Sequence, residues 1–310
     1  IENCTMTRIN IMILLAFTLC GLISKNVMAQ SYKKFSHYNG GSGIEEVSRL
    51  QVVNGESYLL GTTRSANFPV TNATTYKGLV DITLTKYDVN GNVVYATYLG
   101  GTYNETITAM QVLNGEVYLT GTTESINYPV TNGSVFKGGL QDVFVTKLNS
   151  NGSIGFSTYL GGGRNETPGI NALQIIGSEL VLAGTTGSTG YPVTNNTVYG
   201  GGPSDIFVTK LNAANGNILF STLYGGDSTD NLVRTEFDNG AVYVLGTSFS
   251  TDLPVTVGNF LNDPVQNGFI TKFSQTNLDI SYARYLGGFG SDFITASKLD
   301  NGVLHIGGYT

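Results

Sequence analysis

The chain has 310 residues and a formal net charge of −6, and only 12% of its residues are charged. Soluble domains usually carry about 25% charged residues, and no basic stripe is present, so a nucleic-acid partner is not expected. With 41 Gly, no Trp and 11% aromatic residues, the composition is that of strands and turns around an apolar core, not of a disordered tail.

Residues 1–29 are predicted to lie outside the fold, as upstream read-through followed by a signal peptide. Arg8 precedes an apolar run over residues 11–23, and small residues before Gln30 fit cleavage between Ala29 and Gln30. The run is too short for a comfortable membrane span. We therefore expect a secreted or cell-surface protein without a transmembrane segment after cleavage.

The two cysteines, Cys4 and Cys20, both lie in this leader. Leu19 is a poor residue before a lipidated cysteine, so a lipoprotein is disfavoured. The mature chain is then expected to have no disulfide, no thiol nucleophile and no cysteine-bound metal.

A pair of glycines recurs through residues 30–310 and divides this predicted propeller domain into repeats of about 60 residues. The pairs are Gly100-Gly101, Gly161-Gly162, Gly225-Gly226 and Gly287-Gly288, with a degenerate copy at Gly40-Gly41. The repeats span about 41–100, 101–161, 162–225 and 226–287, with a partial fifth over 288–310. Such spacing is the signature of a repeat fold.

Each repeat is predicted to form four strands, which are clearest in the second repeat. They are expected over residues 107–112, 116–122, 142–148 and 154–159. Asn114-Gly115, between the first two strands, is the dipeptide preferred in a type I′ turn, where both central residues need positive φ. Asn151-Gly152 turns the chain between the last two strands.

The strand sequences indicate sheets that are covered on both faces. VFVTKL at residues 143–148 and EVYLTG at 116–121 are apolar or neutral on both sides, as in sheets sandwiched between neighbours. Four-stranded units stacked face to face are propeller blades. The predicted fold is an all-β propeller of four-stranded antiparallel blades, with four full blades and part of a fifth.

The motifs in combination point to a known family. Tyr-Leu-Gly-Gly, Gly-Thr-Thr, Phe-Pro-x-Thr and Asp-x-Phe-Val-x-Lys-Leu together resemble the bacterial SBBP repeat family of seven-bladed β-propellers. The resemblance runs from about residue 33 to Thr310. It implies an exported surface or extracellular protein without a defined activity. Because the chain stops within a repeat, we expect a fragment of a larger propeller.

Charged residues recur in phase with the glycines. They include an acid after each glycine pair (Glu105, Glu166), an Asp that opens the third strand (Asp142, Asp205) and a Lys near its end (Lys147, Lys210). A catalytic residue is needed once, whereas these recur, so we interpret them as structural. A buried lysine needs a partner, and we expect these lysines to pair with the recurring acids between blades.

Other candidate chemistry is sparse. No Gly-Lys-Ser/Thr or predicted helix follows the glycine pairs, so we expect them to adopt unusual φ at strand crossings rather than to bind phosphate. His37 and His305 form no ligand pair, and no Gly-x-Ser-x-Gly motif is present. Residues 88–92 have one carboxylate, too few for a calcium loop. No cofactor or metal is expected.

The longer connections of each repeat are expected to lie on one face, opposite the tight turns. This face is the default binding surface, because loops on a rigid scaffold carry recognition. Its apolar-Pro-Val-Thr unit recurs, and we expect that unit to pack rather than to bind. Departures from the repeat are better candidates: Arg64, Arg164 and the stretch from Phe249 to Asn267.

These observations favour an exported, non-enzymatic propeller that acts as a binding scaffold for a glycan, a protein or a cell-surface polymer. The alternative is the propeller part of a polysaccharide-acting hydrolase or lyase whose catalytic residues lie outside this chain. A third interpretation is a spacer without a ligand of its own. Carboxylates, His and Tyr that occur once would favour the enzyme, and a loop face without exposed aromatic residues would favour the spacer.

Overall fold

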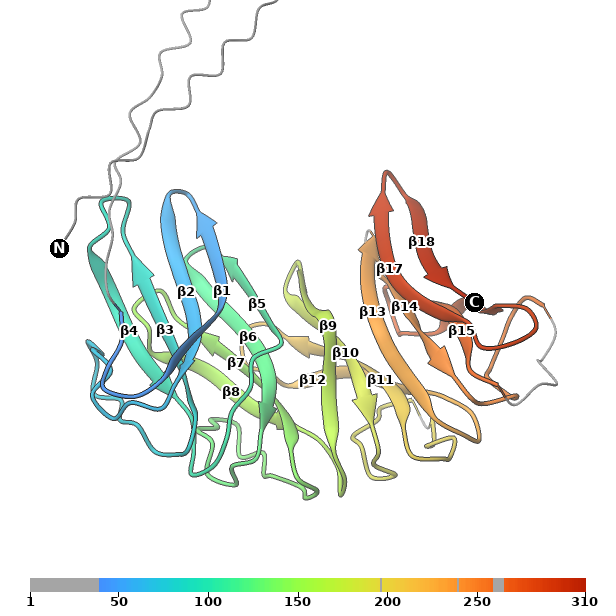
Figure 1. Ribbon diagram of the computed structural model, residues 1–310, viewed down its shortest axis with the longest axis horizontal. Helices are drawn as coiled ribbons and strands as arrows, with labels where there is room; N and C mark the ends of the chain where they lie inside the picture. Colours follow the sequence, from blue (N-terminus) through green and yellow to red (C-terminus); the bar gives the residue numbers. More distant parts are fainter. Residues whose placement is uncertain (1–38, 196, 239, 259–264) are drawn as a thin grey trace, which may run out of the picture. The chain divides into compact units, whose positions relative to one another are not determined.

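All regular elements of the described chain are β-strands (Figure 1). The computed structural model describes residues 39–195, 197–238, 240–258 and 265–310. The expected signal peptide, residues 1–29, lies outside this part of the chain. None of the described residues belongs to a helix long and apolar enough to span a membrane.

The strands follow the repeats in order. The first repeat forms β1 (Glu45–Val53), β2 (Glu56–Thr63), β3 (Asp81–Tyr87) and β4 (Val93–Leu99). The second forms β5 (Ala109–Leu113), β6 (Glu116–Thr123), β7 (Asp142–Leu148) and β8 (Ile154–Leu160). The third forms β9 (Glu166–Ile176), β10 (Glu179–Thr186), β11 (Asp205–Asn212) and β12 (Ile218–Tyr224). The fourth forms β13 (Asp230–Asp238), β14 (Ala241–Ser248), β15 (Asn267–Phe273) and β16 (Ile280–Leu286), and β17 (Phe293–Asp300) and β18 (Val303–Tyr309) follow.

Strands pair with their neighbours in sequence within each of the first four repeats, which gives antiparallel four-stranded sheets. β17 and β18 form a two-stranded hairpin. One parallel bridge, between Arg234 of β13 and Ile170 of β9, joins the third and fourth sheets. The prediction of an all-β fold built from four-stranded antiparallel sheets is therefore confirmed.

The first hairpin turn of the repeat has the predicted geometry. Asn114 and Gly115 have φ of 52° and 79°, and Asn54 and Gly55 have φ of 52° and 81°. Positive φ at both central residues is the requirement of a type I′ turn, whose twist matches that of the two strands that it joins. The turns therefore fix the register of β1 with β2 and of β5 with β6.

Adjacent sheets share hydrophobic cores, which explains why the strands are apolar on both faces. Leu60, Leu84 and Leu99 of the first repeat pack in one cluster with Leu119 and Phe144 of the second. Corresponding clusters join the second repeat to the third and the third to the fourth. All seven residues of β3 are buried. Burial of apolar side chains between sheets is the dominant stabilising term for such a stack.

The apolar-Pro-Val-Thr unit is packed, as expected. Tyr128 and Phe68 are 2% and 5% exposed. The hydroxyl of Tyr98 in β4 accepts a hydrogen bond from the Phe68 N–H at 2.8 Å and donates one to the Ser65 carbonyl at 2.7 Å. These bonds fasten the connection between β2 and β3 onto its own sheet, so the connection is a fixed support for the loop face.

The expectation of unusual φ at the glycine pairs is wrong. None of Gly100, Gly101, Gly161 and Gly162 has φ in the left-handed region. The reason for glycine is steric. A Cβ on Gly161 would lie 2.4 Å from Asp142 Oδ1 and 2.7 Å from Glu166 Oε2, closer than any side-chain carbon can approach.

The expected partner of the lysines is also wrong. Lys147 pairs at 2.7 Å with Glu116, which opens β6 of the same sheet, and not with the recurring acid Glu105. Lys210 pairs in the same way with Glu179 at 3.0 Å. The lysine lies near the turn end of the third strand, whereas the recurring acids lie at the other end of the sheet, so only the Glu after the hairpin turn is within reach.

Candidate functional site

One position on the loop face carries a different kind of residue in each of the four repeats, although its backbone makes the same hydrogen bond in all four. The residue directly after the second strand donates its N–H to the residue before the recurring acid, at 2.9 to 3.1 Å in the four sheets. The residues at this position are Arg64, Glu124, Gly187 and Phe249. The backbone at this position is the same, but the side chain is a cation, an anion, an aromatic ring or absent. A repeat protein can acquire specificity at such a position.

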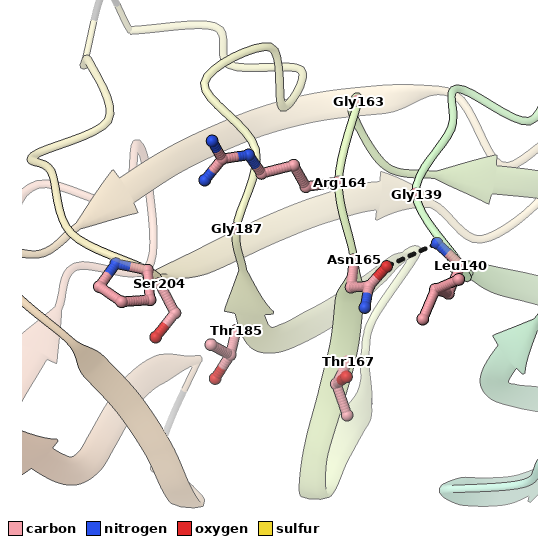
Figure 2. Close-up of a pocket in the computed structure, with 10 residues that line it drawn as sticks. Gly139, Leu140, Gly163, Arg164, Asn165, Thr167, Thr185, Gly187 and Ser204 are labelled. Atoms are coloured by element: carbon pink, nitrogen blue, oxygen red, sulfur yellow. Dashed lines mark hydrogen bonds between the residues drawn. The ribbon is translucent and has the colours of Figure 1, made fainter.

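The glycine at this position leaves a cavity in the third repeat. A cavity of about 500 Å³ opens there, with a wall that includes Leu140, Gly163, Arg164, Gly187 and Pro203 (Figure 2). A Cβ on Gly187 would lie 3.1 Å from the Pro203 carbonyl oxygen and 3.5 Å from Arg164 Cβ. A longer side chain at position 187 would therefore begin in the space between Arg164 and Pro203.

Arg164 supplies the charge of this cavity. Its side chain is exposed and extends from its own loop toward the loop that carries Gly187 (Figure 2). No carboxylate within the described ranges forms a salt bridge with it. Its backbone is fixed, because the Arg164 N–H donates to Ser188 Oγ at 2.8 Å. The guanidinium therefore offers its donors from a rigid base.

The rest of the polar lining consists of hydroxyl and amide groups. Asn165 accepts a hydrogen bond from the Leu140 N–H through Oδ1 at 2.6 Å, which leaves its NH2 group as a donor. Thr185 Oγ1 accepts from the Leu232 N–H at 3.2 Å, and Thr167 Oγ1 accepts from Gln141 Nε2 at 3.1 Å. None of the ten lining residues is aromatic.

The electrostatics near the cavity are mixed. Burial, with a smaller contribution from the carboxyl group of Asp205, raises the pKa of the Tyr199 hydroxyl to about 12, and the charge of Arg164 opposes the shift. Tyr199 donates its hydroxyl proton to the Gly202 carbonyl at 3.0 Å. Arg164 therefore lies close enough to Tyr199 for its charge to influence the titration of that hydroxyl.

The structure separates the four predicted binding residues. Arg164 lines the cavity, whereas Arg64 and Phe249 are exposed in the first and fourth repeats at the loop position that Gly187 occupies in the third. Asn267 is 2% exposed at the start of β15, so it is not on the loop surface, and that prediction is wrong. Residues 259–264 of the divergent stretch lie outside the described residues.

The recurring acids Glu105, Glu166, Asp142 and Asp205 are buried, with exposures of 1% or less. They lie where one sheet meets the next, beneath the glycine pairs. The described residues contain no group of three or more His, Cys, Asp or Glu side chains placed to hold a metal ion.

The sequence identified Arg164 but not the residues that surround it. Gly187, Thr167, Thr185 and Ser204 were not singled out. A signal for the first was available, because glycine takes the place of Arg64, Glu124 and Phe249 in the aligned repeats. The threonines and the serine are common residues on strands and loops, and their convergence depends on how two sheets pack.

Comparison with known proteins adds little. No protein-family model matches the chain, and no curated protein matches it. Among solved structures, it is similar to two quinohemoprotein alcohol dehydrogenases. That from Comamonas testosteroni has 9% identity and a TM-score of 0.42 over 86% of this chain and 39% of its own. ADHIIG from Pseudomonas putida HK5 has 10% identity and a TM-score of 0.38 over 83% of this chain and 37% of its own.

BamB from Moraxella catarrhalis is also similar, with 8% identity and a TM-score of 0.33 over 86% of this chain and 85% of its own. The chain spans less than two fifths of the length of the two dehydrogenases. At these identities and scores, the likenesses assign no activity and no ligand.

Proposed function

We propose that this protein is an exported, non-enzymatic binding module of the SBBP type, whose sheets are blades of a larger β-propeller. The ligand site is the cavity between the second and third repeats. The observation that carries the proposal is the combination of Gly187, which leaves the cavity open, with Arg164, which extends into it without a salt-bridge partner in the described chain. Both residues differ from their counterparts in the other repeats, and they lie side by side in the cavity wall.

The lining favours a glycan that bears a carboxylate. A guanidinium group binds a carboxylate through two parallel hydrogen bonds. Asn165, Thr167 and Thr185 offer amide and hydroxyl groups of the kind that pair with sugar hydroxyls. Because no aromatic ring lines the cavity, a neutral sugar would lack a stacking surface, and the charge on Arg164 becomes the main source of selectivity.

Binding of an acidic polysaccharide tests this function. We expect the protein to bind polygalacturonate in isothermal titration calorimetry and not to bind neutral dextran, with an affinity that falls as salt is added. Arg164→Ala should weaken binding at least tenfold, because truncation of a group that pairs with a charge costs about 2 kcal/mol or more.

Arg64→Ala is the matched control, since Arg64 is exposed on the same face of another sheet and its loss should leave the affinity unchanged. Equal affinity of the Arg164→Ala variant and the unaltered protein for polygalacturonate would contradict the proposal. Release of shorter saccharides during the titration would favour the hydrolase or lyase instead.

A further inference from the structure

The junctions between sheets contain pairs of buried carboxyl groups. The Asp that opens the third strand of one repeat meets the acid that begins the next repeat, as Asp142 meets Glu166, and both side chains have no exposed surface. Asp81 meets Glu105 in the same way, at exposures of 0% and 1%. Asp205 and Asp230 occupy the same two positions at the third junction, both are fully buried, and the charge of Asp230 contributes to a raised pKa at Asp205.

The backbone closes over the Asp142–Glu166 and Asp81–Glu105 pairs. The position of a Cβ on Gly161 lies 2.4 Å from Asp142 Oδ1 and 2.7 Å from Glu166 Oε2. For Gly100 the corresponding distances are 2.4 Å to Asp81 Oδ1 and 2.8 Å to Glu105 Oε2. The two carboxyl groups therefore face each other beneath one glycine, which leaves no room for a side chain between them and solvent.

Protein donors reach three of the four oxygens of the Asp142–Glu166 pair. Asp142 Oδ2 accepts a hydrogen bond from the Lys137 N–H at 2.8 Å. Glu166 Oε1 accepts one from Thr186 Oγ1 at 2.7 Å, and its Oε2 accepts one from the Gly162 N–H at 3.1 Å. These donors hold the acids in place from both repeats.

At least one oxygen of each pair lacks a donor. Asp142 Oδ1, Asp81 Oδ1 and Glu105 Oε2 are buried without a hydrogen-bond partner, as are Oδ1 of Asp205 and Oδ1 of Asp230. Two ionised carboxylates have no proton to share, and an unpaired buried charge is costly. A single proton on either acid supplies the missing donor, as in other carboxyl pairs that share one site.

The fourth junction has a neutral amide in place of one acid. Its strand begins with Asn267 in place of Asp, at 2% exposure, and the facing acid is Asp292, whose Oδ2 accepts from the Gly288 N–H at 2.9 Å. A Cβ on Gly287 would lie 2.3 Å from Asp292 Oδ2 and 3.0 Å from Asn267 Oδ1. Asn267 has nearly the shape of a protonated aspartic acid and is neutral. Its Nδ2 donates to the Val265 carbonyl at 2.8 Å, and its Oδ1 has no hydrogen-bond partner, so this junction has an unpartnered oxygen without a second buried negative charge.

We propose that each of the three acid pairs holds one shared proton, which fastens adjacent sheets together and is released as the solution becomes alkaline. The inference is independent of the proposed ligand. It goes beyond a structural role for the acids, because it makes the cohesion of the sheets depend on pH.

The direction of the effect follows from the pKa shifts. Burial is the main cause that raises the pKa of Glu105, Asp142 and Asp205, each to about 7. Between the ordinary carboxyl range and about pH 7, the folded protein then binds more protons than the unfolded chain. Stability is therefore greatest on the acid side and falls as the pH rises through this window.

The other ionisable groups near the pairs are three charged side chains and a set of tyrosines. Lys137 opposes the shift at Asp142, Lys77 opposes that at Asp81, and Asp252 raises the pKa of Asp205 and Asp230. The remaining facing groups are tyrosines whose own pKa values are raised by burial: Tyr76, Tyr98, Tyr128, Tyr159, Tyr191, Tyr199, Tyr224 and Tyr285. These tyrosines stay neutral across this window, so the acid pairs dominate the response.

Urea unfolding between pH 4 and pH 9 tests the shared proton, with two substitutions that exchange the natural alternatives. Asp142→Asn copies the fourth junction into the second, and should raise the urea midpoint above that of the unaltered protein at pH 8 while reducing the fall between pH 4 and pH 8. Asn267→Asp copies the acid pair into the fourth junction and should make the fall steeper.

Infrared difference spectra give a second readout that does not depend on unfolding. The unaltered protein should retain the carbonyl stretch of a protonated carboxylic acid at pH 6, and Asp142→Asn should weaken it. A urea midpoint that does not fall between pH 4 and pH 8, or absence of the protonated-acid band at pH 6, would overturn the proposal. So would a drop in the midpoint on addition of EDTA, which would assign a bound cation to the pairs.

Discussion

At the scale of single residues, one glycine hydrogen separates the backbone from two buried carboxyl groups at the junctions closed by Gly100 and Gly161. Gly161 has an ordinary φ, so its need for glycine arises from the closeness of Asp142 and Glu166 alone. The sequence shows that the glycine recurs with both acids in phase. It does not show that all three meet, because the acids belong to different repeats and their contact depends on how the sheets pack.

A pair of alanine substitutions separates the steric role from backbone flexibility. Gly161→Ala should lower the free energy of unfolding by about 2 kcal/mol, because the new methyl group must displace buried carboxyl oxygens. Gly163→Ala, two residues away, meets no atom within 4 Å and should change stability by less than about 0.5 kcal/mol. Urea unfolding at pH 6 compares the two, and equal losses would contradict the steric explanation.

The site residues show a similar limit of prediction. Arg164 could be identified because it departs from the repeat, and so could Asn267, yet only Arg164 lines a cavity. Asn267 departs for a different reason, since it replaces one acid of a buried pair. A break in a repeat therefore marks a position of interest, and burial decides whether that position can meet a ligand.

At the scale of the elements, the hairpins were the most predictable part of the fold. Asn-Gly demands a specific turn, and Asn114-Gly115 has it. The third repeat lacks the dipeptide and turns at Gly177 instead, with φ of 61°. The lysine pairs were not predictable from spacing. Lys147 reaches Glu116 because β6 and β7 lie side by side in antiparallel register. The recurring acids, which the sequence suggested as partners, lie at the opposite end of the sheet.

A substitution at the turn tests its contribution. Asn114→Val places a β-branched residue at a φ of 52°, where such residues are strained, and should destabilise the protein by about 1–2 kcal/mol. Asn114→Gly should be tolerated within about 0.5 kcal/mol, because glycine adopts positive φ readily. Thermal unfolding followed by circular dichroism distinguishes them, and a valine variant as stable as the glycine variant would show that the turn does not constrain the sheet.

At the scale of the whole molecule, the repeated sheets stabilise the fold, and the positions at which the repeats differ are the candidates for function. Strands that are apolar on both faces predicted stacked sheets, and the shared cores confirm that adjacent sheets bury each other. What the repeat pattern could not provide is the cavity beside Gly187. A cavity is the space that side chains leave, and its lining combines residues from the connection between β6 and β7 of the second repeat with residues of the third.

The central claim is that function lies where the repeats differ, and copying a residue from one repeat into another tests it most directly. Gly187→Glu places in the third repeat the residue that Glu124 provides in the second, and it puts a side chain and a negative charge beside Arg164. Calorimetric titration with polygalacturonate, on protein shown to unfold at the unaltered temperature, is the measurement. We predict that binding is lost with the fold intact; a Gly187→Glu variant that binds as tightly as the unaltered protein would contradict the account.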